Sequence, residues 1–153
     1  MKTCLITGAS GGVATALAEL LRAQGWRLAR VSRDAGKLAP AEGELAIEAD
    51  VATEAGAEAA LAQATEAFGH PPDAVAHCAG AILIAPIGRT SEAQYRACMA
   101  ANLDSAFFVS KAYAPRVQKS DRPGALLFFS SVAAGMGVSN HAVIAMAKAG
   151  VEG

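Results

Sequence analysis

The sequence predicts an α/β protein built on a doubly wound parallel sheet. Short apolar runs alternate with longer amphipathic runs along the whole chain, which is the pattern of repeated strand–helix–strand units. A glycine-rich segment, Thr7–Ala14, follows the first apolar run and precedes a helical pattern, as at a sharp strand-to-helix turn. The 153 residues contain no internal repeat, linker or low-complexity segment. We therefore expect a single domain over residues 1–153.

Five short apolar runs are predicted to be strands: Thr3–Thr7, Arg27–Ser32, Leu45–Ala49, Ala74–His77 and Ala125–Phe129. Helices are expected over Val13–Gln24, Thr53–Phe68 and Glu92–Val117, with a short turn at Ala35–Leu38. Boundary residues support these helices. Gly25 follows the first, Gly69 follows the second, and Ser91 precedes the third with Gln94 at the capping-box position.

A last helical pattern begins at His141, behind Ser139 and Asn140, and continues to Gly153. Ser and Asn are residues that commonly cap a helix N-terminus. Because the chain stops inside this pattern, we expect the sequence to be the first part of a longer protein, or the ordered part of one.

The segment Thr7–Ala14 is predicted to hold a phosphate group. Gly8 permits the sharp turn, Gly12 lets the backbone approach a pyrophosphate, and Ala14 allows the helix to pack on its strand. The helix N-terminus adds unpaired N–H groups and a positive dipole end. A flexible turn is the alternative, but the flanking strand and helix favour a dinucleotide, and no Gly-Lys-Ser/Thr follows to make a nucleoside-triphosphate loop. The predicted cofactor contacts in this segment are Thr7, Gly8, Ser10, Gly11, Gly12 and Val13.

Composition narrows the other function classes. The net charge of −1 does not indicate a basic surface that would bind nucleic acid or an anionic membrane. No run of about 18 apolar residues is present to span a bilayer, and the N-terminus has no secretory signal pattern, so we expect a cytoplasmic protein. Cys4, Cys78 and Cys98 have neither disulfide nor metal-ligand spacing, so we predict no metal site and interpret them as small buried hydrophobes.

Further motifs follow the later strands. In order along the chain, the landmarks are Thr7-Gly8 with Gly12, Asp50-Val51, Cys78-Ala79-Gly80, Asn102, Ser131 and Lys148. Together they resemble the short-chain dehydrogenase/reductase family, and the resemblance covers essentially the whole chain. The glycine motif TGxxxGxG has Ala14 as its last residue, and Cys78 stands where the family has the first residue of Asn-Ala-Gly.

The resemblance implies a Rossmann fold, a nicotinamide cofactor and roles for single residues. Asp50 is expected against the adenine, and Asp50, Val51, Cys78, Ala79, Gly80 and Lys148 are all expected to contact the cofactor. Ser131 is expected to hold a substrate carbonyl and Lys148 the ribose. Asn102 is expected to anchor a water relay.

One position departs from the family pattern. The family's general acid/base is the tyrosine of a YxxxK motif, and four residues before Lys148 this chain has Ile144, which has no proton to give. His141 is the nearest substitute, because on a helix His141, Ile144 and Lys148 project from nearly the same face. The alternative is that His141 is an exposed or capping residue at the helix start. His77 is interpreted as a hydrogen-bonded residue at a strand end.

Cofactor preference depends on the end of the second strand. An acidic residue there binds the ribose 2′-hydroxyl of NAD, whereas an arginine pairs with the 2′-phosphate of NADP. Ser32 and Arg33 occupy this position, which favours NADP(H) over NAD(H). Two observations leave the alternative open: Asp34 can compete for the ribose, and Gly11 replaces the basic residue found in many NADP-binding members.

Two functions follow from these residues. The first is hydride transfer between nicotinamide and a small carbonyl compound or alcohol. The second is a catalytically impaired NADP(H)-binding family member that acts as a sensor or assembly subunit. Loss of the tyrosine favours the second, and retention of Asn102, Ser131 and Lys148 favours the first. The family resemblance also implies a homodimer or homotetramer.

Overall fold

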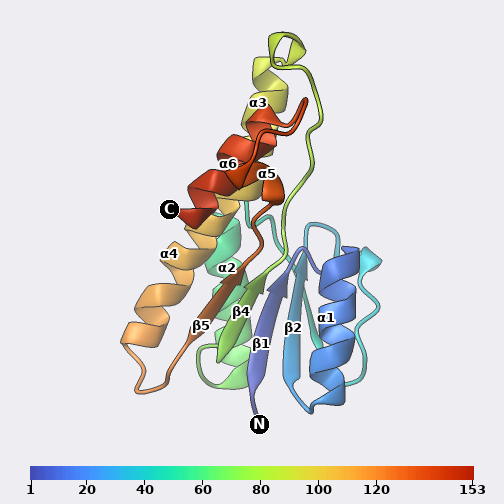
Figure 1. Ribbon diagram of the computed structural model, residues 1–153. Helices are drawn as coiled ribbons and strands as arrows, with labels where there is room; N and C mark the ends of the chain where they lie inside the picture. Colours follow the sequence, from blue (N-terminus) through green and yellow to red (C-terminus); the bar gives the residue numbers. More distant parts are fainter.

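The computed structural model describes residues 1–153, and a parallel sheet lies at its centre (Figure 1). The strands are β1 (Thr3–Thr7), β2 (Arg27–Ser32), β3 (Leu45–Glu48), β4 (Ala74–His77) and β5 (Ala125–Phe128). They pair in the order β3-β2-β1-β4-β5, and every neighbouring pair is parallel. The predicted doubly wound α/β class is confirmed, as are all five strands, two of which end one residue earlier than expected.

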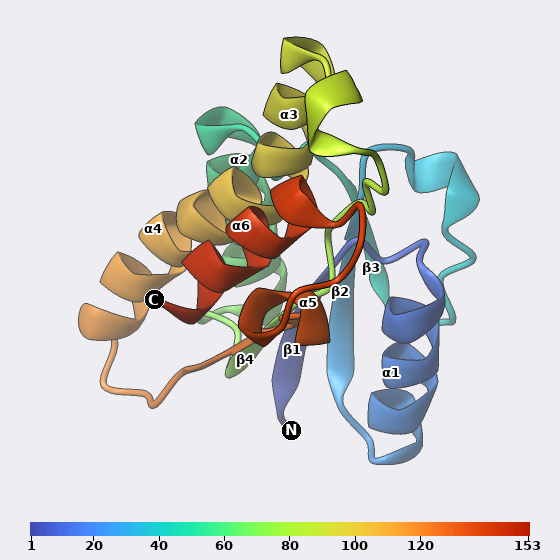
Figure 2. The same cartoon turned by 45° about the horizontal axis from the view of Figure 1, so that its top comes forward.

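Helices lie on both faces of the sheet. They are α1 (Gly12–Ala23), α2 (Glu54–Phe68), α3 (Glu92–Met99), α4 (Ser105–Gln118), α5 (Val132–Gly135) and α6 (Ala142–Glu152), with short turns η1 (Ala35–Lys37), η2 (Ile87–Arg89) and η3 (Ala100–Asp104). Helix α1 covers one face, whereas α2 and α4 pack together on the other (Figure 2). Helices α3, α5 and α6 lie beyond the carboxyl ends of the strands (Figure 1). The helices α5 and η2 were not predicted from the sequence.

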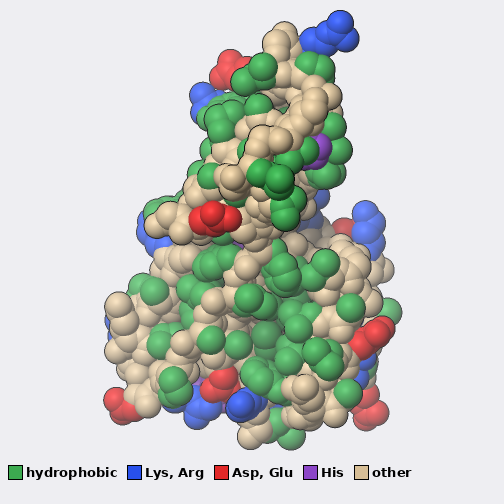
Figure 3. Space-filling view, in the orientation of Figure 1, with side chains coloured by type: hydrophobic (Ala, Val, Ile, Leu, Met, Phe, Trp, Pro, Cys, Tyr) green, Lys and Arg blue, Asp and Glu red, His purple; other side chains and the backbone are tan.

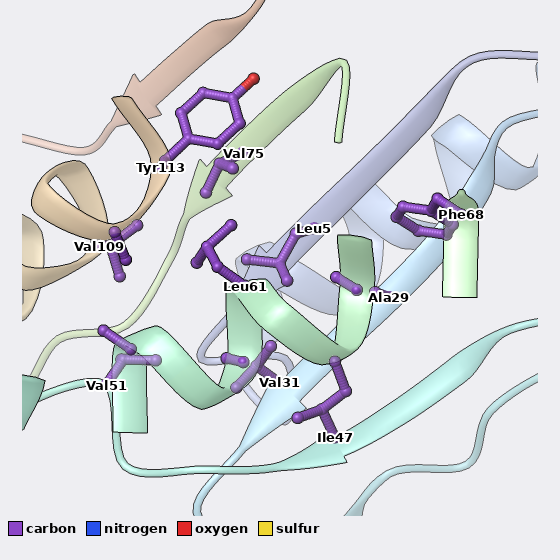
Figure 4. Close-up of a cluster of buried hydrophobic side chains, with 14 residues drawn as sticks. Leu5, Ala29, Val31, Ile47, Val51, Leu61, Phe68, Val75, Val109 and Tyr113 are labelled. Carbon is purple, nitrogen blue, oxygen red and sulfur yellow. The ribbon is translucent and has the colours of Figure 1, made fainter. Parts of the chain in front are cut away.

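Alternation along each strand divides the core into two layers. Leu5 faces α2 and α4, in the large cluster shown in Figure 4 that also contains Leu61 and Val109. Cys4 and Ile6 face α1, where Ala14 packs in the second cluster. Successive side chains of a strand point to opposite faces, so a sheet with helices on both sides needs continuous apolar strands. This requirement explains the short apolar runs in the sequence.

Strand β5 forms one edge of the sheet and is less buried than the other strands. Leu126 and Leu127 are both exposed, as is Phe129 directly after the strand. Helix α1 lies over β1 and β2, so it covers only part of its face of the sheet. Figure 3 shows apolar side chains at the surface over the uncovered strands.

The predicted continuous helix Glu92–Val117 is wrong in its middle. The structure has two α-helices, α3 and α4, separated by the π-helical turn η3. Within this turn the side-chain amide of Asn102 donates hydrogen bonds to the carbonyl oxygens of Cys98 and Ala81, at 2.9 and 2.8 Å. The wider turn therefore turns Asn102 inward and binds it to the loop after β4. Such π-turns frequently occur at functional sites.

The last helix starts differently from the predicted Ser/Asn cap. Its N-cap residue is His141, and no side chain caps the helix. Asn140 instead has the left-handed backbone conformation, with φ of 59°, and its carbonyl accepts a hydrogen bond from the N–H of Ala85. Asn tolerates this conformation better than most residues. The chain therefore uses Asn140 to turn into α6 rather than to cap it.

Candidate functional site

A groove of about 350 Å³ lies at the carboxyl ends of β1 to β4. Its lining includes residues at the ends of β1 and β2, namely Gly8, Ser10, Gly11, Ser32 and Arg33. It also includes residues after β3 and β4, namely Asp50, Val51, Cys78, Ala79 and Gly80. Strand β1 has β2 on one side and β4 on the other, so the groove lies where the strand order reverses. In open α/β sheets this point is the usual ligand site.

The glycine segment is shaped for a close approach of backbone to ligand. Gly8 has φ of +60°, and a Cβ atom there would lie 2.7 Å from backbone atoms of Ala79. The N–H of Gly11 donates to the carbonyl of Gly8 at 2.9 Å, which closes the turn. At Gly12, the first residue of α1, a Cβ would meet open space. No side chain caps α1 and its first turn holds no acidic residue, so its N–H groups remain available to an anion.

Three residues predicted in this segment, Thr7, Gly12 and Val13, lie outside the groove lining. Thr7 is buried, and its hydroxyl oxygen accepts a hydrogen bond from the N–H of Ala79 at 3.2 Å. It therefore holds the loop after β4 against the glycine turn. Val13 is exposed on α1 and does not line the groove.

At the end of β2 the structure separates the two candidates for the ribose. Ser32 is buried, and its hydroxyl accepts a hydrogen bond from the N–H of Asp34 at 3.3 Å. Arg33 is exposed and lines the groove. The Asp34 carboxylate accepts from the N–H of Gly36 at 3.0 Å, lies 3.6 Å from Nζ of Lys37, and does not line the groove. Arg33 is thus the charged group of this strand end that faces the site.

The ends of β3 and β4 complete the opposite wall. Asp50 is exposed, and its carboxylate accepts a hydrogen bond from the N–H of Ala52 at 3.0 Å. Val51 is buried in the core beneath it. Cys78 is half-buried, and burial raises the pKa of its thiol to about 11, so the thiol is neutral at pH 7. This wall therefore presents one carboxylate and otherwise uncharged groups.

Asn102 and Lys148 both approach Gly80 from beyond the groove. A Cβ atom at Gly80 would lie 2.8 Å from Oδ1 of Asn102 and 3.7 Å from Nζ of Lys148, so a side chain there would require Asn102 to move. The Lys148 ammonium donates a hydrogen bond to the carbonyl of Phe129 at 2.8 Å. Burial lowers the pKa of Lys148 from its ordinary value, and interaction with Cys98 partly offsets this effect. These contacts fix the lysine at the end of β5.

Ser131 lies two residues after Phe129, at the N-cap position of α5. Its hydroxyl accepts a hydrogen bond from the N–H of Ala133 at 3.2 Å, and the side chain is half-buried. The short helix α5 therefore holds Ser131 just past the strand that also anchors Lys148.

His141, Ile144 and Lys148 have different surroundings. Ile144 is 6% exposed and belongs to an apolar cluster with Cys98 and Val143. His141 is half-buried and lines a second cavity of about 550 Å³ between the loop after β4 and the start of α6. Its Nδ1 atom lies 2.6 Å from the carbonyl of Ser139. The position of the expected tyrosine thus packs against α3, while His141 faces a cavity.

Two buried polar side chains beneath the site were given little or no role by sequence reasoning. His77 was interpreted as a hydrogen-bonded strand-end residue, and this is confirmed: its ring nitrogens lie 2.9 Å from the hydroxyl of Thr7 and 3.0 Å from that of Ser105. Arg30 is buried in β2 and bonds to the glycine segment. A single charged residue in the middle of an apolar strand is the signal by which Arg30 can be found.

Two kinds of feature are absent from residues 1–153. No group of three or more His, Cys, Asp or Glu side chains is gathered so as to hold a metal ion. No helix combines the length and the apolar character needed to cross a lipid bilayer.

Comparison with known proteins gives a consistent family assignment. Residues 2–153 match the family model described as short chain dehydrogenase. The 3-oxoacyl-[acyl-carrier-protein] reductase MabA of Mycobacterium tuberculosis is 32% identical over 152 residues, covering 99% of this chain and 60% of that protein. The (3R)-3-hydroxyacyl-CoA dehydrogenase of Canis lupus familiaris is 31% identical over 165 residues, covering 97% of this chain and 63% of that protein. The chain thus spans about three fifths of the length of these relatives.

Solved structures show the same fold. A short-chain dehydrogenase from Streptomyces avermitilis superposes with a TM-score of 0.90 at 22% identity, covering 99% of this chain and 57% of the other. The aldohexose dehydrogenase of Thermoplasma acidophilum, in ligand-free form, superposes with a TM-score of 0.87 at 25% identity, covering 98% of this chain and 57% of the other.

Proposed function

Since the chain belongs to the short-chain dehydrogenase family, we propose that it is an NAD(P)-dependent oxidoreductase that transfers a hydride between nicotinamide and a small carbonyl compound or alcohol. One observation carries this proposal. Residues from the ends of four strands, chosen from the sequence as cofactor contacts, line a single groove at the point where the strand order reverses.

The glycine segment fits the pyrophosphate of a dinucleotide. The N–H of Ser10 has no hydrogen-bond partner in the chain, and the space in front of Gly12 is open. Both features suit an anion held by backbone N–H groups at the start of α1. The carboxylate of Asp50, on the opposite wall, suits the amino group of an adenine. Lys148 suits the hydroxyls of the nicotinamide ribose.

The cofactor in this proposal is NADP(H) in preference to NAD(H). Arg33 lines the groove, and a guanidinium binds a 2′-phosphate through charge-assisted hydrogen bonds. Asp34, the competing acid, is engaged by the N–H of Gly36 and lies near Lys37. This strand end therefore offers a free cation to a 2′-phosphate, whereas the carboxylate that would accept from a 2′-hydroxyl is already engaged.

When bound, the nicotinamide supplies or accepts the hydride. Ser131 donates a hydrogen bond to the substrate oxygen, which stabilises negative charge developing there. The Lys148 ammonium, partly withdrawn from water and bonded to the Phe129 carbonyl, adds positive charge next to the same place. Asn102 fixes the loop after β4 through Ala81, which orients the groove wall and gives a relay water an anchor.

His141 is the proton donor in this proposal. A backbone carbonyl only accepts, so the contact with Ser139 requires a proton on Nδ1 of His141. Nε2 is then the nitrogen that gains and loses a proton. Imidazole is the commonest general acid in enzymes, and the cavity that His141 lines admits a small molecule.

The surroundings of Ile144 favour a second candidate, a catalytically impaired NADP(H)-binding protein that acts as a sensor or assembly subunit. Ile144 is buried against Cys98 and Val143, where burial raises the pKa of the cysteine thiol, and the partly buried Tyr95 packs against the same cluster from α3. A protein that only binds the cofactor needs no acid at this position.

The proposal also covers the oligomeric state, the cellular location and the partners of the protein. Residues 1–153 act as one nucleotide-binding domain in a cytoplasmic homodimer or homotetramer, with a small-molecule substrate and no nucleic acid or membrane partner. The exposed aromatic ring of Phe107 on α4 is compatible with a subunit contact there. Sedimentation of the purified protein tests the oligomeric state.

An activity screen separates the two candidates. NADPH oxidation is followed with a panel of aldehydes and ketones, for the wild type, Ser131→Ala and His141→Ala. The oxidoreductase proposal expects turnover in the wild type and a loss of about 10²-fold or more in each variant, because a positioned hydrogen-bond donor or general acid contributes that much. NADPH binding without turnover of any compound supports the binding protein instead. Absence of NADPH binding contradicts both.

A further inference from the structure

Arg30 is a charged residue at the centre of a buried strand. Its neighbours Ala29 and Val31 belong to the large apolar cluster, and Arg30 itself is 6% exposed on the opposite face of β2. Taking a guanidinium out of water is costly unless partners replace the lost hydration. An apolar residue at this position would fill the strand without that cost. The contacts of Arg30 therefore indicate what the charge does.

The guanidinium lies beneath the glycine segment. Nη2 donates a hydrogen bond to the carbonyl of Ala9 at 2.8 Å, and Nη1 donates to the carbonyl of Ala39 at 3.3 Å. Nη1 also lies 3.7 Å from the carboxylate of Glu44, which is itself held by Arg22 at 2.6 Å. The Nε atom is buried without a partner. The charge is thus only partly compensated and lies directly under the loop that faces the groove.

The bond to Ala9 fixes the direction of the next peptide group. The chain has no cis peptide bond, so the carbonyl of Ala9 and the N–H of Ser10 point in opposite directions. Because the carbonyl points inward to Arg30, the N–H of Ser10 points away from the core. Ser10 is exposed and lines the groove, and its N–H has no partner in the chain. Arg30 thereby presents a free donor on the groove side of the loop.

We propose that Arg30 is a positioning residue for the cofactor pyrophosphate, which holds the Ala9 carbonyl inward so that the N–H of Ser10 faces a phosphate oxygen. Its charge, which Glu44 compensates only in part, lies behind the loop and favours the same anion. The proposal rests on the proposed cofactor site, since it assigns a part of the pyrophosphate contact to a residue that never touches the ligand.

The test compares two ligands that differ in the pyrophosphate. Dissociation constants for NADPH and for adenosine 2′-monophosphate, which has no pyrophosphate, are measured by calorimetry in the full chain. The variants are Arg30→Met, which keeps the length of the side chain without the charge, and Arg30→Lys. Arg22→Met is the matched control, because Arg22 binds the same Glu44 but does not contact the glycine segment.

We expect Arg30→Met to weaken NADPH binding about tenfold or more and to change binding of the monophosphate less than about twofold. Arg30→Lys restores part of the NADPH affinity, and Arg22→Met leaves it within about twofold of the wild type. Equal loss for both ligands, or no loss for NADPH, overturns the proposal. If the wild type binds neither ligand, the cofactor site itself is contradicted, and so is the proposed role of Arg30.

A second measurement covers the case in which Arg30→Met does not fold. Hydrogen exchange of the Ser10 amide is followed in the wild type with and without NADPH. Protection of this amide by NADPH supports the proposal, since the N–H then donates to the ligand. Exchange that NADPH leaves unchanged overturns it.

Discussion

The Nδ1 atom of His77 lies 2.9 Å from the hydroxyl oxygen of Thr7, in the buried layer beneath the glycine segment. On the other side of the ring, Nε2 lies 3.0 Å from the hydroxyl of Ser105, which itself donates to the carbonyl of Ala101 at 2.8 Å. The Ser105 oxygen therefore accepts from Nε2, and Nδ1 accepts from Thr7. A neutral imidazole satisfies this chain of hydrogen bonds. The chain connects β1 with the π-turn that holds Asn102.

Protonation of His77 is expected to destabilise the fold. Burial, aided by the charge of Lys148, lowers the pKa of His77 to about 4. An unfolded chain binds this proton near pH 6.5, so the unfolded state binds more protons than the native state between these values, and stability falls as the pH falls. We expect a loss of about 2 to 3 kcal/mol between pH 7 and pH 4 from this residue.

Urea unfolding across that pH range measures the effect. The control is His77→Asn, which keeps an amide that can donate and accept but does not titrate. Carboxylates titrate in both proteins, so the difference between the two pH profiles isolates His77. Profiles that run parallel would falsify this assignment.

Two glycines of the same turn are expected to respond differently to substitution. Gly12→Val adds a side chain in open space at the start of α1, so it leaves the free energy of unfolding within about 1 kcal/mol while weakening NADPH binding more than about tenfold. Gly8→Ala brings a Cβ to 2.7 Å from Ala79 at a φ of +60°, so it destabilises the fold itself. Calorimetry with NADPH and circular dichroism measure the two effects. Full NADPH affinity in a folded Gly12→Val contradicts the pyrophosphate site.

The sequence was sufficient to predict strands and helix boundaries where the pattern is local. The strands and the boundaries at Gly25, Gly69 and Ser91 follow from periodicity and capping, and the structure contains them, including the complete capping box of Ser91 with Gln94. The π-turn at Asn102 was missed because its cause is tertiary. The side chain binds Ala81, 21 residues away, and no propensity scale records that contact.

The candidate site was predictable from the sequence to a similar extent. Motif order places residues at strand ends, and parallel strands bring those ends to one edge, which explains why ten of the predicted cofactor contacts share a groove. The sequence does not determine which way a helical side chain packs. His141 is the N-cap residue of α6 and lines a cavity, whereas Ile144, three residues later in the helix, joins the cluster with Cys98.

Arg33 is expected to set the cofactor preference. Arg33→Ala removes the cation that lines the groove and weakens NADPH binding about tenfold or more, while NADH binding changes less than about twofold, because a charge-assisted bond to a phosphate contributes about 1.5 to 3 kcal/mol. Lys37→Ala is the control, since this exposed lysine of the same loop does not line the groove. Titration of both cofactors by fluorescence measures the effect. Equal wild-type affinities for NADH and NADPH would show that the preference is wrong.

Ile144→Tyr is expected to test the missing proton donor directly. A positioned acid contributes about 10² to 10⁴-fold, so a phenol that reaches the reacting oxygen raises the rate of carbonyl reduction by a substantial part of that factor. Ile144 is enclosed by Cys98 and Val143, so the larger ring also costs about 1 to 3 kcal/mol of stability through overpacking. The matched control is Ile144→Phe, which adds the same ring without the hydroxyl.

Rates for the wild type and both variants, measured with NADPH and an activated carbonyl compound, separate the two effects. A gain in Ile144→Tyr that is absent in Ile144→Phe assigns the deficit to the acid, and the gain persists when His141→Ala is added, because the phenol then replaces the histidine. In the wild type His141→Ala removes most of the rate if Nε2 of His141 supplies the proton. A brisk wild type that His141→Ala leaves unchanged contradicts that role. A folded Ile144→Tyr that binds NADPH but stays inert contradicts the oxidoreductase proposal and favours a protein that binds the cofactor without turning over a substrate.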